Sequence, residues 1–242
     1  MSGMVPSTDA FNDLVDDCVG WNVGPWQRGI HAILAHVGVP AFAGARVLEV
    51  GAGRKSTLAP VFAALGASAV ASFWGSDPSA LVLSITDKYK LALPVRVEQL
   101  DILHPHDMGE FNFIVAKSVL GGLALHDNFE ALAIALSNMR RILKPGGALL
   151  LLENGYGTNI HAMLRRFLGA GRNGWHYFSY DEFIHYVLKG DDQFFDTFGL
   201  FSFADFRLRA VNRTAFALDE KVNRLINRRN RLIYTAVTRT SA

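Results

Sequence analysis

The fold is decided by the stretch Val47-Leu48-Glu49-Val50-Gly51-Ala52-Gly53. Its apolar half predicts a buried strand over 46–50, and its glycines predict a tight turn into a following helix. Glycine has no Cβ, so a ligand can approach the backbone there, and a helix N-terminus offers free N–H groups to a carboxylate or phosphate. Dinucleotide-binding enzymes and purely structural turns use the same arrangement, so the loop by itself leaves the ligand open.

Strand-like and helix-like apolar segments alternate on both sides of this loop. Further strands are predicted near 69–74, 95–100, 111–116 and 148–153, and the last is apolar throughout, as a parallel strand covered on both faces should be. Two helices with apolar faces are predicted before residue 44, and residues 144–147 (Lys-Pro-Gly-Gly) are predicted to end the helix before the last of these strands. The alternation predicts an α/β fold with an open, mostly parallel sheet and helices on both faces.

Acidic residues follow the predicted strands at chemically suggestive places. Asp77 comes after the second strand, where a carboxylate suits a ribose diol, and Asp101 ends the third, where it can accept a hydrogen bond from an adenine amino group. Glu49 stands just before the glycines. These companions favour a nucleoside-containing cofactor at the glycine loop.

Five segments together resemble the class I S-adenosylmethionine-dependent methyltransferases in order and spacing, over about residues 46–153. They are VLEVGAG, the GSDPS turn, Leu100-Asp101, FNFIVAKSVL and RILKPGGALLLLE. The resemblance implies a Rossmann-like, seven-stranded sheet that ends in an antiparallel hairpin. It also implies transfer of a methyl group from S-adenosylmethionine, with S-adenosylhomocysteine as the product.

The resemblance further implies the cofactor-binding residues. Gly51, Ala52 and Gly53 would hold the methionine portion with Glu49 beside them; Asp77 with Pro78 would hold the ribose, and Asp101 with Ile102 the adenine. Lys117 would pass the methionine portion with its backbone and turn its side chain outward, because an ammonium repels a sulfonium. Trp21 and Trp26 either close over the cofactor or pack in the core.

Two departures from the family pattern bear on this assignment. Lys55 stands where many members have a third glycine, and Gly121-Gly122 stands where some have a histidine pair. A dehydrogenase, the main enzymatic rival, would need glycine at position 56, which is Ser56. A cofactor-binding relative without catalytic activity stays open.

Candidate catalytic residues lie after the last parallel strand. His176 has a pKa range suited to a general base, and Tyr177 beside it can orient an acceptor; His126 is a second candidate base. The alternative is that these side chains only pack the region. No metal site is predicted, since Glu153-Asn154 supplies only half of a catechol-type site and the histidines of 104–107 sit in a proline-containing loop.

We expect one domain: N-terminal helices over 1–44, a cofactor-binding core over 46–154, a substrate lid over 155–190 and C-terminal strands over 191–242. The lid region contains an amphipathic segment and a capping box, Ser179 to Glu182, that predicts a helix start. The late strands are expected near 201–209 and 232–237. The variable lid favours a small-molecule acceptor, such as a secondary metabolite, that is methylated at oxygen or nitrogen.

Charge and cysteine content set the expected partners and location. From Arg207 to the end, nine Lys and Arg residues face two acidic residues, a net charge of +7 that leaves −5 for the rest of a chain whose total is +2. This basic tail supports RNA or protein methylation as the alternative, although nucleic acid is not the expected partner. A single cysteine, no signal peptide and no membrane-length apolar run favour a cytoplasmic protein without a membrane partner. The oligomeric state is not predicted.

Overall fold

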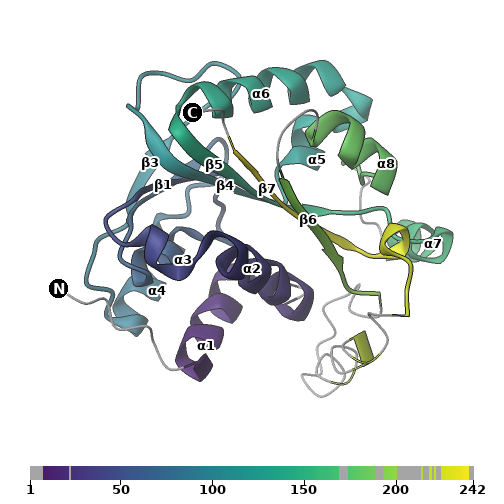
Figure 1. Cartoon of the computed structure of the whole chain (residues 1–242), viewed down its shortest axis with the longest axis horizontal. Helices are drawn as coiled ribbons and strands as arrows, with labels where there is room; N and C mark the ends of the chain where they lie inside the picture. Colours follow the sequence, from purple (N-terminus) through teal and green to yellow (C-terminus); the bar gives the residue numbers. More distant parts are fainter. Residues whose placement is uncertain are drawn as a thin grey trace.

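The computed structural model describes residues 8–21, 23–168, 174–188, 193–200, 214, 218–219, 221 and 225–239. A seven-stranded sheet in the order β3-β2-β1-β4-β5-β7-β6 forms its centre (Figure 1). The five strands from β3 to β5 are parallel, and β7 runs antiparallel between β5 and β6. The predicted Rossmann-like sheet with an antiparallel C-terminal end is therefore confirmed. The strands are β1 (Arg46–Val50), β2 (Ser68–Phe73), β3 (Arg96–Gln99), β4 (Phe111–Lys117), β5 (Leu143–Asn154), β6 (Gln193–Phe198) and β7 (Ile233–Arg239).

Helices cover both faces of the sheet. The first four α-helices lie on one face, and α5, α6 and the turn η3 lie on the other (Figure 1). The helices are α1 (Thr8–Val19), α2 (Val23–Val37), α3 (Ala59–Ala64), α4 (Ser79–Tyr89), α5 (Leu120–Leu123), α6 (Phe129–Arg141), α7 (Asn159–Leu168) and α8 (Tyr180–Glu182), with the short turns η1 (Val39–Phe42), η2 (Leu125–Asp127), η3 (Phe183–Val187) and η4 (Arg228–Asn230).

The central strands are buried on both faces. In β4, Phe113 and Val115 pack in the cluster beneath α1 and α2, whereas Ile114 and Ala116 pack in the cluster beneath α5 and α6. Residues 149–152 of β5 are at most 1% exposed. Double-sided burial explains why these strands carry continuous apolar runs rather than an alternating pattern.

Three elements differ from the sequence-based expectation. Helix α4 was not anticipated, because only Val82 and Ile85 along it are buried and the periodic signal is weak. Residues 144–147 do follow the end of α6, yet they belong to β5 as an irregular stretch between Leu143, which pairs with Phe111, and Ala148, which pairs with Phe113. Strand β6 lies at 193–198, whereas the expected strand at 201–209 falls outside the described residues.

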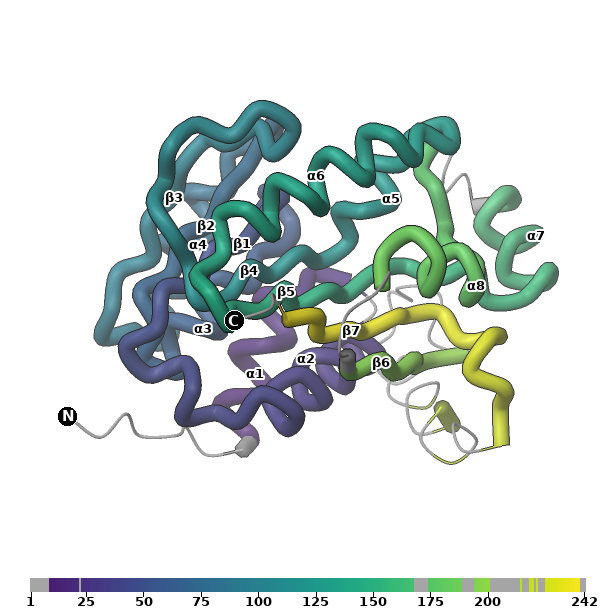
Figure 2. Tube along the Cα trace, turned by 45° about the horizontal axis from the view of Figure 1, so that its top comes forward, coloured from purple at the N-terminus to yellow at the C-terminus, as the bar shows by residue number. Residues whose placement is uncertain are grey.

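Strand β7 confirms the last predicted strand, and basic residues just before it pair with acids. Arg228 and Arg231 lie 3.7 and 3.8 Å from Asp196 of β6, and Arg229 pairs with Asp181 of α8. Both views place α7 and α8 at the end of the molecule opposite β3 (Figures 1 and 2). Within the described residues, no helix combines the length and apolarity that crossing a membrane requires.

Candidate active site

The glycine loop follows β1 and leaves its backbone open. Gly51 has φ +80°, and a Cβ there would lie 2.4 Å from the Val119 side chain, so only glycine fits. Gly53 and Ser56 exchange backbone hydrogen bonds of 2.9 and 3.2 Å, which closes a tight turn. Around the position of a Gly53 Cβ, no heavy atom of the described residues lies within 4 Å. The loop is thus a rigid, uncovered backbone surface that a ligand can approach.

Glu49 is buried beneath the glycine loop and does not face its uncovered surface. It is 3% exposed, and its Oε2 accepts hydrogen bonds from Thr57 Oγ1 (2.7 Å) and Ala59 N (2.8 Å) at the start of α3. Burial raises the pKa of its carboxyl group, and these hydrogen bonds act against that rise. A contact of Glu49 with the cofactor stays a prediction.

Asp77 closes the turn before α4. Its Oδ1 accepts hydrogen bonds from the backbone N–H and the hydroxyl of Ser79, which hold the pKa of the exposed carboxyl below its usual value. Pro78 occupies the N-cap position of α4. The second carboxylate oxygen of Asp77 has no hydrogen bond in the described part of the chain, and it can accept one from a hydroxyl.

Asp101 and Ile102 follow β3. Asp101 accepts a hydrogen bond from Leu103 N (2.9 Å) and pairs with His104 Nδ1 (3.0 Å), which together hold its pKa below the usual value. The carbonyl of Ile102 accepts from Asn138 of α6 at 2.9 Å, so the loop is fixed to that helix. Within the described residues, no group of three or more His, Cys, Asp or Glu side chains could hold a metal ion.

The side chain of Lys117, the last residue of β4, points inward. The sequence-based expectation of an outward side chain was wrong. It is only 5% exposed. Its Nζ lies 3.6 Å from the ring centroid of Trp21 and 4.6 Å from that of Trp26, and it donates to Ser56 Oγ at 3.0 Å. The cause is strand geometry, because side chains two residues apart share a face and residues 113 and 115 already face α1 and α2.

Burial lowers the pKa of Lys117 to about 7, although the nearby carboxyl groups of Glu49 and Glu153 act against that fall. Of the two tryptophans beside it, Trp26 is fully buried in the core, and its Nε1 has no hydrogen-bond partner in the described structure. The partly exposed Trp21 lies over the lysine. A buried amine that loses its proton near neutral pH therefore stands beside the glycine loop.

Glu153, at the end of β5, positions the start of α5. It is fully buried, and its Oε2 accepts hydrogen bonds from the backbone N–H groups of Val119 (2.9 Å) and Leu120 (2.6 Å). Burial raises the pKa of this carboxyl group, and the backbone hydrogen bonds act against that rise. Since Val119 also packs against Gly51, this acid connects the glycine loop to the helix that follows β4.

The segment 175–178 packs against the other side of α5. His176 N donates to Gly121 O at 3.0 Å. A Cβ on Gly121 would lie 2.3 Å from Trp175 Nε1, and one on Gly122 would lie 3.0 Å from the same indole ring. The two glycines therefore make room for Trp175. The short helix α5 thus contacts the segment 175–178, and its N-cap residue Val119 contacts the glycine loop.

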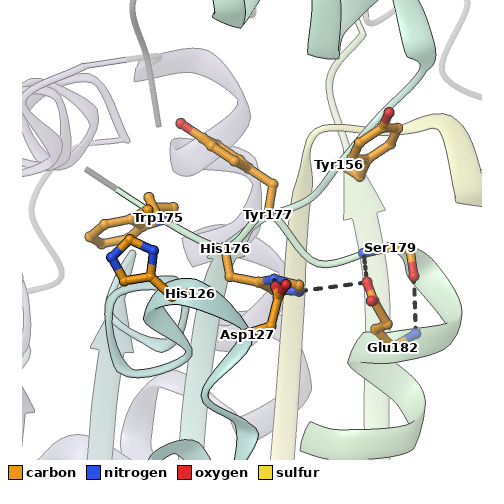
Figure 3. A pocket seen from close by; sticks show the side chains of 9 residues that line it. His126, Asp127, Tyr156, Trp175, His176, Tyr177, Ser179 and Glu182 are labelled. Carbon is orange, nitrogen blue, oxygen red and sulfur yellow. Dashed lines mark hydrogen bonds and ion pairs between the residues drawn. The ribbon is translucent and has the colours of Figure 1, made fainter. Parts of the chain in front are cut away.

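His176 is held from several sides. Its Nδ1 lies 2.7 Å from Asp127 Oδ1 and its Nε2 lies 3.6 Å from Glu182 Oε2. The rings of Phe129 and Phe178 meet it edge to face, at 5.0 and 4.8 Å between centroids. An acid at Nδ1 is the arrangement that orients a histidine base, although Nε2 is buried here (Figure 3). A catalytic role for His176 thus stays a prediction.

A cavity of about 610 Å³ lies beside these residues; it is lined by His126, Asp127, Tyr156, Gly174, Trp175, His176, Tyr177, Ser179 and Glu182 (Figure 3). The structure therefore brings together the three predicted catalytic residues, His126, His176 and Tyr177. His126 and Asp127 have φ of +54° and +62°, a left-handed conformation that is uncommon outside glycine. Such conformations are most often tolerated at functional sites.

Arg165 of α7 was missed by the sequence analysis. Its guanidinium carbon lies 4.1 Å from the ring centroid of Tyr177, and its Nη2 donates to Gly155 O at 2.8 Å. Burial raises the pKa of the Tyr177 hydroxyl, against the effect of the neighbouring Arg165. The spacing of α7 marks an amphipathic helix, but it does not indicate which arginine turns inward.

The family model described as a methyltransferase domain matches residues 24–191, more than half of the chain. The chain belongs to this family. The predicted enzyme class is therefore confirmed, and the residues above are those of a methyltransferase domain. No curated protein matches it significantly.

Solved structures share the fold of this methyltransferase domain at low identity. Phosphoethanolamine N-methyltransferase 2 from Haemonchus contortus, in complex with phosphomonomethylethanolamine and S-adenosylhomocysteine, aligns with a TM-score of 0.59 at 14% identity over 90% of this chain. The match covers 53% of that protein, so the chain spans about half of its length.

Two further structures extend the comparison. The N-methyltransferase NodS from Bradyrhizobium japonicum WM9 has a TM-score of 0.53 at 16% identity, with 90% of this chain and 98% of NodS covered. An O-methyltransferase family protein from Burkholderia thailandensis has a TM-score of 0.56 at 15% identity, with 97% and 60% covered. At these identities the likeness establishes the fold.

Proposed function

We propose that this methyltransferase domain binds S-adenosylmethionine at the carboxyl ends of β1 to β4 and methylates an oxygen or nitrogen atom of a small-molecule acceptor. The observation that carries the proposal is that α5 contacts both places. Val119 at its N-cap packs against Gly51, and Trp175, which lines the 610 Å³ cavity, packs on Gly121 and Gly122. In-line transfer needs the methyl carbon and the acceptor atom about 3–3.5 Å apart, so we place the reacting end of the acceptor where the cavity comes nearest to the glycine loop.

The residues present fit the cofactor. The uncovered backbone at Gly53 leaves room for the methionine portion, and the open oxygen of Asp77 suits a ribose hydroxyl. Asp101 keeps unused lone pairs on both oxygens for an adenine amino group, since each carboxylate oxygen can accept more than one hydrogen bond.

The acceptor would lie in the cavity that described residues of the predicted lid region, among them Tyr156 and Tyr177, help to line. The cavity is within the usual size range of small-molecule sites and is rich in aromatic side chains, which suits an apolar or aromatic acceptor body. Among structural neighbours, the Haemonchus contortus enzyme was solved with a small phosphorylated amine. This supports a small-molecule acceptor without specifying it.

S-adenosylmethionine would supply a methyl group already activated on a sulfonium, so the chain mainly has to align the acceptor and exclude water. Glu153 holds the start of α5, and the two glycines of α5 accommodate Trp175 at the cavity. His176, oriented by Asp127, is the proposed base for an acceptor that still carries a proton, and Tyr177 is proposed to orient that acceptor.

A nucleic-acid substrate has less support. Arg228, Arg229 and Arg231 in the basic tail already pair with Asp181 or Asp196. A face whose cations are paired attracts phosphate backbones more weakly.

Titration calorimetry tests the proposal. The full chain should bind S-adenosylmethionine and S-adenosylhomocysteine and should not bind a nicotinamide dinucleotide. Gly53→Val provides the structural arm, because its side chain would enter space where the described residues place no atom, so it should block the cofactor while leaving the melting temperature nearly unchanged. Exclusive binding of the dinucleotide, or full cofactor affinity in Gly53→Val, would contradict the proposed site.

A further inference from the structure

Arg165 is a partly buried cation whose neighbours carry no formal negative charge. It donates to a backbone carbonyl, that of Gly155, and stacks on the ring of Tyr177. The ionisable groups that act on it are the hydroxyls of Tyr156, Tyr177 and Tyr234. Within the described part of the chain, no carboxylate lies within ion-pair distance of its guanidinium.

Three arginines near the end of the described chain are paired with acids instead. Arg228, Arg229 and Arg231 each have an aspartate within 4 Å, and Arg229 reaches Asp181 of α8 across the fold. Taking a guanidinium out of water is unfavourable unless its donors are satisfied, and burial accordingly lowers the pKa of Arg165. An arginine has five N–H donors in a planar fork, so Arg165 has donors to spare beyond the one that Gly155 accepts.

A second group near Arg165 is also unsatisfied. Tyr234 of β7 is fully buried, and its hydroxyl has no hydrogen-bond partner in the described structure. Its ring lies against Gly155, the residue whose carbonyl holds Arg165, because a Cβ on that glycine would come within 2.5 Å of it. An unpaired buried hydroxyl and a partly buried cation without a counter-ion thus adjoin the same backbone segment.

Tyr177 connects Arg165 to the cavity. It lines the cavity together with Tyr156, and Arg165 packs on its ring. In Figure 3 the ring of Tyr177 extends away from His176 and Asp127, so the cavity has an acidic and histidine-lined side and a tyrosine-lined side. The charge of Glu153, which holds α5 next to the glycine loop, also acts on the Tyr177 hydroxyl.

We propose that Arg165, stacked on the ring of Tyr177, binds an anionic group of the acceptor, a carboxylate or a phosphate. The proposal rests on the proposed function, because it assigns this subsite to the acceptor cavity. The planar guanidinium matches both anions with paired N–H donors. Binding the anion at α7 would orient the acceptor with its other end toward α5 and the cofactor.

The test uses the full chain and two simple anions, inorganic phosphate and acetate. Thermal unfolding is followed while each anion is titrated, with chloride used to keep the ionic strength constant. The wild type should be stabilised by at least one of the anions, and Arg165→Gln should reduce that affinity by about 10-fold or more, the usual cost of a charge-assisted contact. A response to phosphate alone or to acetate alone distinguishes the two anion classes.

Arg166→Gln is the matched control. It removes the same charge from the neighbouring residue of α7, which is exposed, and it should leave the anion response intact. Arg165→Lys keeps the charge without the planar fork and should retain part of the response, which guards against a folding defect in Arg165→Gln. Equal responses of Arg165→Gln and the wild type, equal losses in both glutamine variants, or no response of the wild type to either anion would overturn the proposal.

Calorimetry with S-adenosylmethionine on the same variants separates the two proposals. Arg165→Gln should bind the cofactor as tightly as the wild type. If the wild type fails to bind the cofactor while an Arg165-dependent anion response persists, the anion site stands and the proposed function fails. Cofactor binding without an Arg165-dependent response gives the reverse result.

Discussion

The two halves of the candidate site are built in different ways. On the cofactor side, Asp77 and Asp101 are held by hydrogen bonds to residues two or three positions further along the chain. On the acceptor side, His176 is held by Asp127, 49 residues away. Local contacts leave a signature in a short stretch of sequence, whereas distant contacts appear only when the chain is folded. The cofactor side was accordingly much easier to anticipate.

The largest expected effect tests the acceptor side. His176→Ala should lower turnover about 10²- to 10⁴-fold, the usual contribution of a general base, and leave cofactor affinity nearly unchanged. His185→Ala, an exposed histidine of η3, serves as the control in steady-state assays once an acceptor is known. Near-normal turnover with a lower melting temperature would instead assign His176 to packing between Phe129 and Phe178.

The next effect tests the cofactor side. Asp77→Ala should weaken S-adenosylmethionine binding by about 10- to 100-fold, because charge-assisted hydrogen bonds to a ribose would be lost. Asp107→Ala is a close match, since Asp107 is an exposed aspartate that closes a similar turn by accepting from Gly109 N. Calorimetry that shows equal affinities for the two folded variants would mean that another residue holds the ribose.

The protonation state of Lys117, which lies beside the glycine loop, predicts a pH dependence of cofactor binding. With a pKa near 7, Lys117 is charged below that pH and neutral above it. A charged lysine repels a sulfonium but not a thioether, so the affinity ratio of S-adenosylmethionine to S-adenosylhomocysteine should rise about 10-fold as the pH is raised through 7. Calorimetry across this range should show a flat ratio for Lys117→Met.

The same lysine should affect stability in a defined direction. The unfolded side chain keeps its proton up to its ordinary pKa of 10.5, so between about pH 7 and that value the unfolded state binds more protons than the folded one. The free energy of unfolding of the wild type should therefore rise with pH in this window relative to Lys117→Met. Parallel pH profiles of the two proteins in denaturant titrations would argue against a buried, neutral lysine.

The smallest effect sharpens the comparison, because it removes a local contact from the acceptor side. Ser179 and Glu182 form a capping box at the start of α8, as the sequence predicted. Ser179→Ala should lower the free energy of unfolding by about 1 kcal/mol, a typical cost of losing an N-cap. Ser137→Ala, an exposed serine of α6, should not destabilise the protein in the same denaturant titration.

The sequence predicted those elements whose conformation is determined by a few consecutive residues. The apolar run of β1, the glycine turn and the capping box each act over a few residues, and each is found where it was expected. Strand β6 was missed because it is an edge strand with Asp196 in its middle, and that aspartate is explained only by Arg228 and Arg231 from the chain's far end.

Two residues of the site show the same limit. The inward turn of Lys117 follows from the alternation of β4, but charge repulsion from a sulfonium pointed to the opposite orientation. The importance of Arg165 depends on Gly155 and Tyr177, which the fold brings to α7 from separate segments. Neither its spacing nor its residue type distinguishes it from Arg166 before the chain is folded.

The packing of Trp175 over Gly121 and Gly122 has a consequence for how this enzyme can change. A Cβ at position 121 would lie 2.3 Å from Trp175 Nε1 and equally close to the backbone oxygen of His176. A larger residue at 121 would therefore collide with the backbone of segment 175–178 as well as with the indole, and shrinking Trp175 alone would not make room for it. A replacement of Gly121 thus has to be accompanied by a shift of that backbone, which ties the sequence of α5 to the path of the segment beside the cavity.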